Sequence, residues 1–445
     1  MPVRSRSATC SLNSARSPTR PPCSSASRPL RRLPPPPAHP KTGKRLQNKG
    51  PEPFTVLTIN GRITLSRRRY FAKDVGSFTP LDTWIDSAEA TISLGAREMA
   101  CRLNLASRNF DKAAENLQRA AQFSLSGESL RQVVEAEGKS VQKAAATGQI
   151  PLDWDYRDCA AHDKGGKETG KTRVYLGSDG VKVPVVTQEE KDARRAKIRA
   201  KRRREGKKCR PLPRPRAGAD QRYKEFKIVT YYDELQEHRL VSVTRGDHEV
   251  AGRLMRRDGG RVGLDKADDK VGLIDGADWI KNQKEKQSLP LDDIGLDFYH
   301  LSDYAHKTKR AVYGEEDPKD KAAPGNVWVA GVLHTAKHKG YEALRDELVA
   351  WKAILRGRKK RQAAEALIRY VTDRREMIKY PQFLAQGRQI GSGPTESMCK
   401  ATTLRIKGVG MRWDADNAEA IMALEALEQS GAWQSYWDNR LAQAA

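Results

Sequence analysis

The stretch RVYLGSDGVKVPVV, residues 173–186, decides the fold class of this 445-residue chain. Its apolar run from Val174 to Leu176 is typical of a buried strand, and Asp179 and a glycine follow the run closely. An acid at the end of a core strand costs free energy unless it is paired or binds a metal. The stretch therefore predicts a sheet that presents a carboxylate where a buried strand ends.

Further strand-like and helix-like segments follow, in the order strand, strand, helix, strand, helix or loop, strand. They are EFKIVTYYD (225–233), HRLVSVTR (238–245), the helix-like HEVAGRLMRRDGG (248–260), KVGLIDGADWI (270–280) and DIGLDFYHL (293–301). Strands that alternate with helices predict an α/β fold with one mixed sheet. We place this core at residues 172–301.

The rest of the chain is helical in pattern around this core, apart from its first part. Residues 302–390 predict a run of helices, and residues 391–445 predict a GSGP turn followed by helices that complete the core. Residues 52–160 predict a hairpin and then helices, which form a helix-turn-helix DNA-binding domain or a plain helical hairpin. The Gly-rich residues 160–171 predict a linker.

Positive charge is concentrated in two segments. Lys and Arg number 82 against 56 Asp and Glu, a net charge of +26. Residues 1–51 contribute +11 and residues 191–216 contribute +12, so the other residues are nearly balanced. The first segment is rich in Ser, Pro and Arg and predicts disorder, as a DNA-binding tail, a transit peptide or a misassigned start. The second predicts DNA contact, because its cations repel one another without a polyanion.

Two function classes are excluded by composition. No run approaches the 18 apolar residues that a membrane-spanning helix needs. The six cysteines are scattered without a C-x-x-C pair, which argues against a zinc ribbon and a disulfide framework. We therefore expect a protein of a reducing compartment whose partner is nucleic acid, with an anionic membrane surface as the weaker alternative.

Three acids stand apart from the others by their positions. Asp179 and Asp275 each follow a buried strand and precede a glycine, which leaves room for a substrate backbone, and Glu396 lies in the first turn of a helix after GSGP. Hydrolysis or exchange of a phosphodiester needs an activated nucleophile and a stabilised leaving oxygen. Two Mg²⁺ ions supply both, and a few carboxylates suffice to hold them. The three acids predict such a two-ion site, in which Mn²⁺ could substitute.

Several motifs resemble the transposases of bacterial insertion sequences, and in particular the ISKra-type family of Mutator-related DDE enzymes. They are SDGVKVP, GADQRYKEF, TRGDHE, LIDGADWI, LDFYHL and GSGPTESMCKATTLRIKG, and the resemblance runs from about Phe54 to Trp437. It implies a ribonuclease-H-like fold with a helical insertion between the second Asp and the Glu. It also implies that Asp179, Asp275 and Glu396 form the DDE triad.

The resemblance suggests two further site residues, and the chain lacks two features that are common in the family. Asp297 and His300 match the family's D-x-x-H motif, although His300 could equally be a core histidine. The cysteine-bearing segment often found before the core is absent, and the expected first helical region is replaced by the Ser/Arg/Pro stretch. Both departures concern recognition of the element ends.

Basic and aromatic residues near these motifs are candidates for DNA contact. Lys400 lies one turn beyond Glu396 and either holds a phosphate or is solvated. Trp279 is assigned to core packing, and the pair His334 and His338 to a solvated helix face. The predicted DNA-contact residues are Arg202, Arg203, Arg204, Lys207, Lys208, Lys400, Arg405 and Lys407, with a further cluster, Arg356, Arg358, Lys359, Lys360 and Arg361, in the insertion.

The predicted function is transposition. The protein would bind the terminal inverted repeats of its element and, as a dimer or larger assembly, cleave double-stranded DNA and join it to a target. Two alternatives remain: a ribonuclease-H-like nuclease or resolvase that cuts without joining, and a DNA-binding remnant without catalysis.

Overall fold

The computed structural model describes residues 38–39, 42–74, 76–80, 91–121, 123–206, 211–214 and 216–444. The chain divides into two units, which are described separately. One comprises the residues up to Glu52 and Arg68–Thr79, and the other comprises Pro53–Arg67 and Pro80–Ala445. The expected disordered tail lies outside the described residues as far as residue 37.

An antiparallel hairpin is the first ordered element. Strand β1 (Gln47–Thr58) leads to β2 (Gly61–Ala72), and β3 (Gly76–Phe78) pairs with β2. The predicted hairpin is confirmed, and the turn is made by Gly61 at a φ of +99°. Strand β1 begins at Gln47, so the boundary of the predicted tail at residue 51 is wrong.

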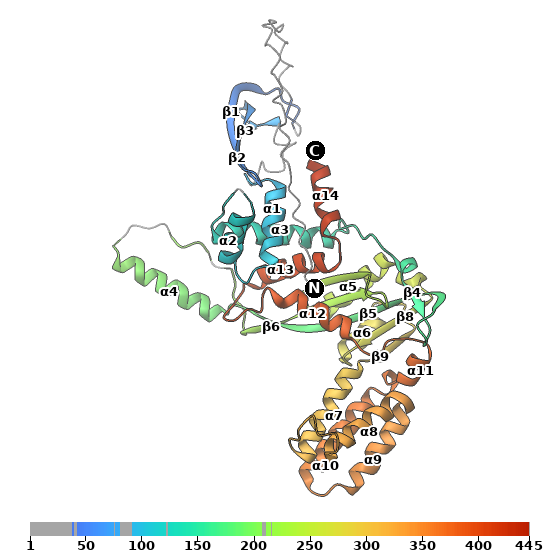
Figure 1. Cartoon of the computed structure of the whole chain (residues 1–445). Helices are drawn as coiled ribbons and strands as arrows, with labels where there is room; N and C mark the ends of the chain where they lie inside the picture. Colours follow the sequence, from blue (N-terminus) through green and yellow to red (C-terminus); the bar gives the residue numbers. More distant parts are fainter. Residues whose placement is uncertain are drawn as a thin grey trace, which may run out of the picture. The chain divides into compact units, whose positions relative to one another are not determined.

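A mixed sheet forms the centre of the second unit (Figure 1). Its main strands are β5 (Glu168–Pro184), β6 (Tyr223–Tyr232), β7 (Arg239–Thr244), β8 (Asp269–Ile274) and β9 (Asp293–Leu296). Their order is β7-β6-β5-β8-β9. Strand β6 runs antiparallel to β5 and β7, whereas β5, β8 and β9 are parallel. The predicted mixed α/β sheet is confirmed.

The sheet corrects three details of the prediction. The supposed linker at 160–171 is instead a hairpin, in which β4 (Ala160–His162) pairs with the start of β5. Strand β8 ends at Ile274, and Asp278 begins helix α6 (Asp278–Lys286). Strand β9 ends at Leu296, and Phe298 begins helix α7 (Phe298–Tyr313). In the last two cases an Asp-Gly turn and an Asp N-cap stop the strand before its apolar pattern ends.

The two faces of the sheet are covered by different helices. Successive strand residues point to opposite faces, so Tyr175 joins one hydrophobic cluster and Leu176 joins the other. Helices on the Tyr175 face are α1 (Leu94–Leu105), α2 (Phe110–Ala120), α3 (Gly127–Ala146), α12 (Gly393–Leu404), α13 (Ala415–Gln429) and α14 (Trp433–Ala444). The Leu176 face is covered by α5 (His248–Val262) and α6.

The N-terminal helices share their core with the sheet. Residues of α1, α2 and α3 belong to the same hydrophobic cluster as Tyr175 and Leu424. Helices α3 and α13 approach closely, since a β-carbon on Gly138 would lie 2.3 Å from the carbonyl oxygen of Ala420. These helices are therefore a layer of the core and not a separately packed domain that precedes it.

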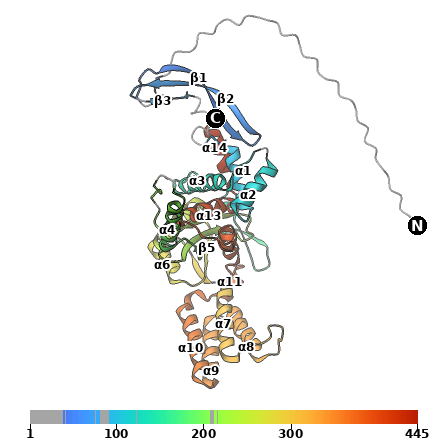
Figure 2. The same ribbon diagram turned by 90° about the vertical axis from the view of Figure 1, so that its left-hand side faces the viewer.

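The predicted helical insertion is confirmed between β9 and α12. It contains α7, α8 (Pro324–Lys339), α9 (Tyr341–Ile354), α10 (Arg358–Asp373) and α11 (Tyr380–Ala385). Figures 1 and 2 show α7 to α10 as a group beyond the β9 end of the sheet. Within the basic segment, helix α4 (Gln188–Arg204) connects β5 to β6 and extends away from the sheet.

Candidate active site

Three aspartates lie side by side across the parallel strands: Asp275 and Asp297 directly follow β8 and β9, whereas Asp179 lies within β5, which continues to Pro184. The prediction that a buried strand ends at Asp179 is therefore wrong, because β5 remains paired with β6 beyond it. The strand register pairs Ser178 with Ile274 and Ile274 with Leu296. The next residues in the three strands are Asp179, Asp275 and Asp297. The backbone N–H of Asp297 donates to the carbonyl oxygen of Ile274 at 2.8 Å, which continues the ladder into this row. Neighbouring strands are about 4.8 Å apart, so the row concentrates negative charge.

The side chains of this row share one face of the sheet. Asp179 has the same strand parity as Tyr175, and Asp275 has the same parity as Leu273, whereas Leu296 lies on the opposite face from Asp297. All three carboxylates therefore point to the face that α12 covers.

Helix α12 brings Glu396 to the same face through a close contact with β5. A β-carbon on Gly177 would lie 1.8 Å from Oγ1 of Thr395, so only glycine allows the helix to approach this closely. The Thr395 hydroxyl is also within 3.0 Å of the hydroxyl of Thr230. Glu396, the next residue after Thr395, lies exposed in the first turn of α12.

Each of the first two aspartates has one oxygen fixed by the backbone. The N–H of Gly180 donates to Asp179 Oδ1 at 2.6 Å, and the N–H of Ala277 donates to Asp275 Oδ1 at 2.8 Å. Burial raises the pKa of Asp179, and the charge of Asp275 raises it further. Burial also raises the pKa of Glu396, with contributions from Asp297 and Asp179. The site is thus a group of carboxylates whose mutual repulsion a cation would relieve.

Asp297 and His300 form a rigid pair at the start of α7. Asp297 is fully buried and caps the helix, and its Oδ2 lies 3.0 Å from the His300 N–H and 2.6 Å from His300 Nδ1. Its Oδ1 accepts the N–H of Ser392 at 2.7 Å, at the start of α12. Burial alone would raise the pKa of Asp297, but these hydrogen bonds hold it below its usual value.

The ionised Asp297 fixes the orientation of the histidine ring. Because the carboxylate only accepts, His300 Nδ1 donates to it, and Nε2 is the nitrogen left for other contacts. The hydrogen bond to Asp297 raises the pKa of His300, and the charges of Asp275 and Glu396 add to the effect. His300 is therefore a half-buried, oriented residue of the site, and the core-histidine alternative is not favoured by this geometry.

A divalent metal fits the donors that this site presents. Asp179 and Asp275 each keep one oxygen beyond their backbone bond, and Glu396 adds a third hard carboxylate ligand. Among the described residues, the three-ligand group whose atoms all lie within 4.8 Å of one another consists of Asp297, His300 and Glu396, and it includes neither Asp179 nor Asp275. Both oxygens of Asp297 already accept hydrogen bonds, so we assign Asp297 to holding His300 and α12 in place rather than to the metal.

The predicted DNA-contact residues have different outcomes. Arg202, Arg203 and Arg204 lie at the end of α4, and Lys400 and Lys407 are exposed on and after α12. Lys207 and Lys208 lie outside the described residues. The assignment of Arg405 is wrong: its side chain is 3% exposed, and its guanidinium donates to the backbone and side-chain oxygens of Asn104. It stacks over Phe110 and Trp413 and joins α1 and α2 to the core.

Other candidates from the sequence take structural positions. Trp279 packs at the edge of the Leu176-face cluster, with the Lys227 ammonium 4.7 Å from its ring centre. His334 and His338 are exposed neighbours on α8 and belong to no three-ligand group among the described residues. Arg356 and its neighbours lie at the turn between α9 and α10.

Two contacts that build the site could not be predicted from sequence. The Thr395–Gly177 contact joins residues more than two hundred positions apart, and the Ser392 N–H reaches Asp297 across 95 positions. The GSGPTES motif drew attention to Glu396 alone. A threonine directly before a site acid, with a glycine two residues before another, is the signal that could have indicated the contact.

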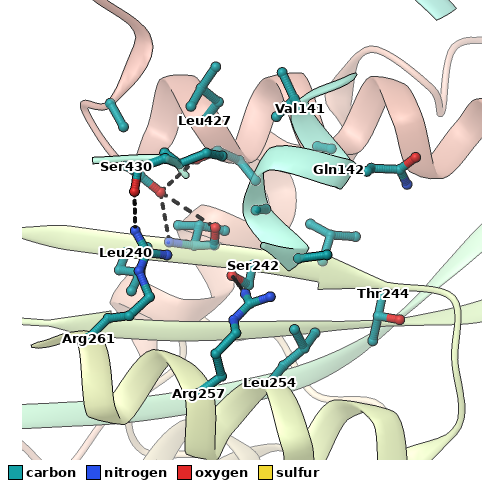
Figure 3. A pocket seen from close by; sticks show the side chains of 18 of the residues that line it. Val141, Gln142, Leu240, Ser242, Thr244, Leu254, Arg257, Arg261, Leu427 and Ser430 are labelled. Carbon is teal, nitrogen blue, oxygen red and sulfur yellow. Dashed lines mark hydrogen bonds between the residues drawn. The ribbon is translucent and has the colours of Figure 1, made fainter. Parts of the chain in front are cut away.

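A separate cavity lies at the other edge of the sheet, away from the acids (Figure 3). It has a volume of about 210 Å³ and lies among α3, α5, α13 and the edge strand β7. Ser430 covers part of the edge, since its hydroxyl accepts the N–H of Val241 at 2.9 Å. The arginines at its wall are already engaged, because Arg261 donates to the Ile150 carbonyl and Arg257 binds Asp258. The cavity is therefore a packing feature beside the edge strand.

Among the described residues, no helix has the length and apolar character needed to cross a membrane. Comparison with known proteins finds no protein-family model and no curated protein that matches this chain.

Proposed function

We propose that the protein is a transposase of a bacterial insertion sequence, similar to the ISKra-type family, which cleaves and joins DNA strands. The observation that carries the proposal is the row of Asp179, Asp275 and Asp297 on neighbouring parallel strands, within β5 and directly after β8 and β9, with Glu396 brought to the same face by α12. The strand order, with only the second strand of the core antiparallel to its neighbours, is the order expected of a ribonuclease-H-like fold. The helical group between the second Asp and the Glu is consistent with the family's insertion.

In this proposal Asp179, Asp275 and Glu396 hold divalent ions, Mg²⁺ or Mn²⁺. Such ions would activate the attacking oxygen and neutralise charge on the phosphate in the transition state. The backbone bonds from Gly180 and Ala277 orient the two aspartates, so that each directs its second oxygen to the substrate side. Asp297 holds His300 with Nε2 free, and the protonated ring would donate to a phosphate oxygen.

The partners follow from the same proposal. The substrate is double-stranded DNA, at the terminal inverted repeats and the target, and joining two ends requires two active sites in a dimer or larger assembly. The protein would then act in the bacterial cytoplasm, on the nucleoid.

The proposal is tested by separating DNA binding from chemistry. Asp179→Asn, Asp275→Asn and Glu396→Gln remove one ligand charge each and should lower Mg²⁺-dependent cleavage of a plasmid carrying the gene's flanks by at least ~10³-fold, as expected for metal-ligand loss. DNA binding should be unchanged within a factor of two to three. The matched control is Asp303→Asn, which removes a negative charge near Glu396 and leaves Asp179, Asp275 and Asp297 unchanged.

Joined products distinguish the alternatives. Wild-type protein that cuts and transfers strands to a second plasmid supports the transposase, whereas cutting without joining favours the nuclease or resolvase. Binding without any Mg²⁺- or Mn²⁺-dependent cutting favours the catalytically inactive remnant. If any of the three variants cut at the wild-type rate, the assignment of that acid would be wrong.

A further inference from the structure

Helix α4 is anchored at its root and contacts the segment that returns to β6, since Arg195 donates to the carbonyl oxygen of Pro213 at 2.7 Å. Thr187 and Glu190 form a capping box at its start, Lys191 pairs with Asp414 at 2.5 Å, and Arg412 pairs with Glu190 at 2.9 Å. All residues of α4 are described, and none of their side chains is buried. Figure 1 shows the helix extending from the sheet. The chain thus holds the root rigidly and leaves the remainder exposed.

The charges of α4 surround its axis. The helix carries nine Lys or Arg, and from residue 193 to residue 204 it has no acid. At 3.6 residues per turn, these cations cover roughly three quarters of the circumference. The remaining strip carries Ala193, Ala196 and Ala200. Ile198 is the single large apolar residue of α4 and is 43% exposed.

This distribution does not suit a protein partner. A helix that docks on protein presents an apolar stripe, and α4 has none. Like charges three and four residues apart destabilise an isolated helix, so a polyanion lying along α4 would stabilise it. A helix lying across one phosphate backbone would need cations on one face only. Cations that cover most of the helix circumference can all pair with phosphates only where phosphates lie on two sides of the helix.

The major groove of duplex DNA places phosphates on two sides of an inserted helix. It is about 12 Å wide, and an α-helix with its side chains measures about 10–12 Å. Phosphate backbones line both sides of the groove, so cations on opposite faces of one helix can reach both. A single strand, or the surface of an anionic membrane, presents phosphates on one side only.

A basic groove at the root of α4 extends this surface. It has a volume of about 910 Å³ and is lined by seven Lys or Arg and two acids. Of the seven cations, Arg405 is the buried residue described above, and Arg131, Lys191 and Arg412 pair with acids. Arg131 comes from α3, Arg194 and Arg195 from α4, and Arg412 from the loop before α13. The loop follows α12, whose 12 residues begin beside Glu396 and span ~18 Å at 1.5 Å per residue. The chain between Glu396 and Arg412 thus connects the acids to the groove.

We propose that α4 inserts into the major groove of duplex DNA and that the basic groove at its root holds the adjoining phosphate backbone. The inference rests on the proposed function for its substrate, DNA, and adds the mode of binding.

Methylation interference tests the insertion directly. Dimethyl sulfate modifies guanine N7 in the major groove and adenine N3 in the minor groove, so one reagent carries its own control. The probe is a pool of random duplexes enriched by binding to the full chain carrying Glu396→Gln, then methylated and separated into bound and free fractions. Guanine-methylated positions should be depleted several-fold from the bound fraction over a few consecutive base pairs. Adenine N3 methylation in that segment should not be depleted.

Charge variants identify the helix responsible. The first variant removes four charges from the end of α4 and replaces them with Gln, which is a good helix former. The changed residues are Lys201, Arg202, Arg203 and Arg204. This variant should lose the guanine interference and lower the salt slope of binding by up to about 3.6, since each phosphate contact contributes about 0.9. The matched control changes Arg358, Lys359, Lys360 and Arg361 to Gln, the same charge loss on α10, and should keep the guanine interference.

Three outcomes would overturn the inference. They are interference at adenine N3 alone, interference unchanged in the α4 variant, and preferential binding of single strands or anionic vesicles over duplex. The proposed function is judged separately by Mg²⁺-dependent cutting. Cutting without guanine interference refutes only the insertion, and guanine interference with no loss of cutting in the triad variants refutes only the triad.

Discussion

Gly177 and Thr395 determine whether the acids of this protein meet. Their contact sets the distance between α12 and β5, and Glu396 is the neighbour of Thr395. The sequence indicated Asp179, Asp275 and Glu396, because each follows an apolar run or a Gly-Pro turn. It could not indicate Arg405 as a buried residue, since the oxygens that receive its hydrogen bonds belong to Asn104, 301 positions away.

Gly177→Ala should separate Glu396 from the aspartates. The added methyl group would meet Thr395 at 1.8 Å and the Thr230 hydroxyl at 2.8 Å, so α12 must move. Overpacking of this kind costs about 1–3 kcal/mol of unfolding free energy. We expect cleavage to fall at least ~10-fold, since misplacement by about 1 Å is enough for larger losses. Denaturant unfolding and a cleavage assay measure the two effects.

Gly393→Ala is the matched control, because a β-carbon there meets nothing within 4 Å in the same helix turn. Equal cleavage by both alanine variants would show that the Gly177 contact does not position Glu396.

Glu425 should make stability depend on pH. Its side chain is 8% exposed in α13, and burial raises its pKa to about 7. The folded state therefore holds a proton that the unfolded chain releases near pH 4.5, so this group's contribution to stability is present below pH 4.5 and is lost as the pH rises to 7. A shift of this size corresponds to about 3 kcal/mol.

Glu425→Gln should remove the loss of stability that the wild type shows as the pH rises from 4.5 to 7. The variant should therefore be more stable than wild type at pH 8 and differ little from it at pH 4.5. Thermal melts across this range measure the difference. A variant whose melting temperature tracked the wild type at every pH would contradict the buried proton.

Elements were predicted well where the hydrophobic pattern is long and poorly where glycine and aspartate interrupt it. The strands of the sheet and the helices from α7 to α13 follow apolar periodicity and were found. The β4–β5 hairpin was missed, because residues 160–171 are rich in glycine and charge and pair through the backbone. The strand ends at Ile274 and Leu296 were misplaced, since a helix N-cap there depends on one hydrogen bond.

Gly138→Ala tests the packing of α3 on α13. Alanine favours a helix by about 1 kcal/mol over glycine, but its β-carbon would lie 2.3 Å from the Ala420 carbonyl oxygen. The steric cost of this clash should exceed the gain in helix propensity and lower the unfolding free energy by about 1–3 kcal/mol. Gly260→Ala in α5, where a β-carbon meets nothing within 4 Å, is the control and should stabilise slightly. Denaturant titration of both variants decides, and a stabilising Gly138→Ala would mean that the two helices are not in close contact.

The second unit folds as one body, because its N-terminal helices and its sheet share a hydrophobic cluster. The sequence suggested a separate domain at residues 52–160, since a break in composition follows the helices. Nothing in the pattern of α3 shows that its apolar side will pack on a helix nearly three hundred residues later.

A chain that starts at residue 151 should therefore fail to fold. Without α1, α2 and α3 it exposes the side chains of α13 and α14 that these helices cover. We expect aggregation on gel filtration and no cooperative thermal transition by circular dichroism. A soluble, cooperatively melting product with cleavage activity would show that the helices are a separate domain.

The route of Glu396 to the sheet also has a consequence for protein synthesis. Asp179 leaves the ribosome 217 residues before Glu396, which at 5–20 residues per second is a delay of roughly 10–40 s. During that interval the strands that carry the aspartates exist without the helix that completes the site, and their α12 face has no cover. Under the proposed function, a nascent chain without α12 would not yet cleave the DNA nearby, but it exposes apolar surface that chaperones would bind.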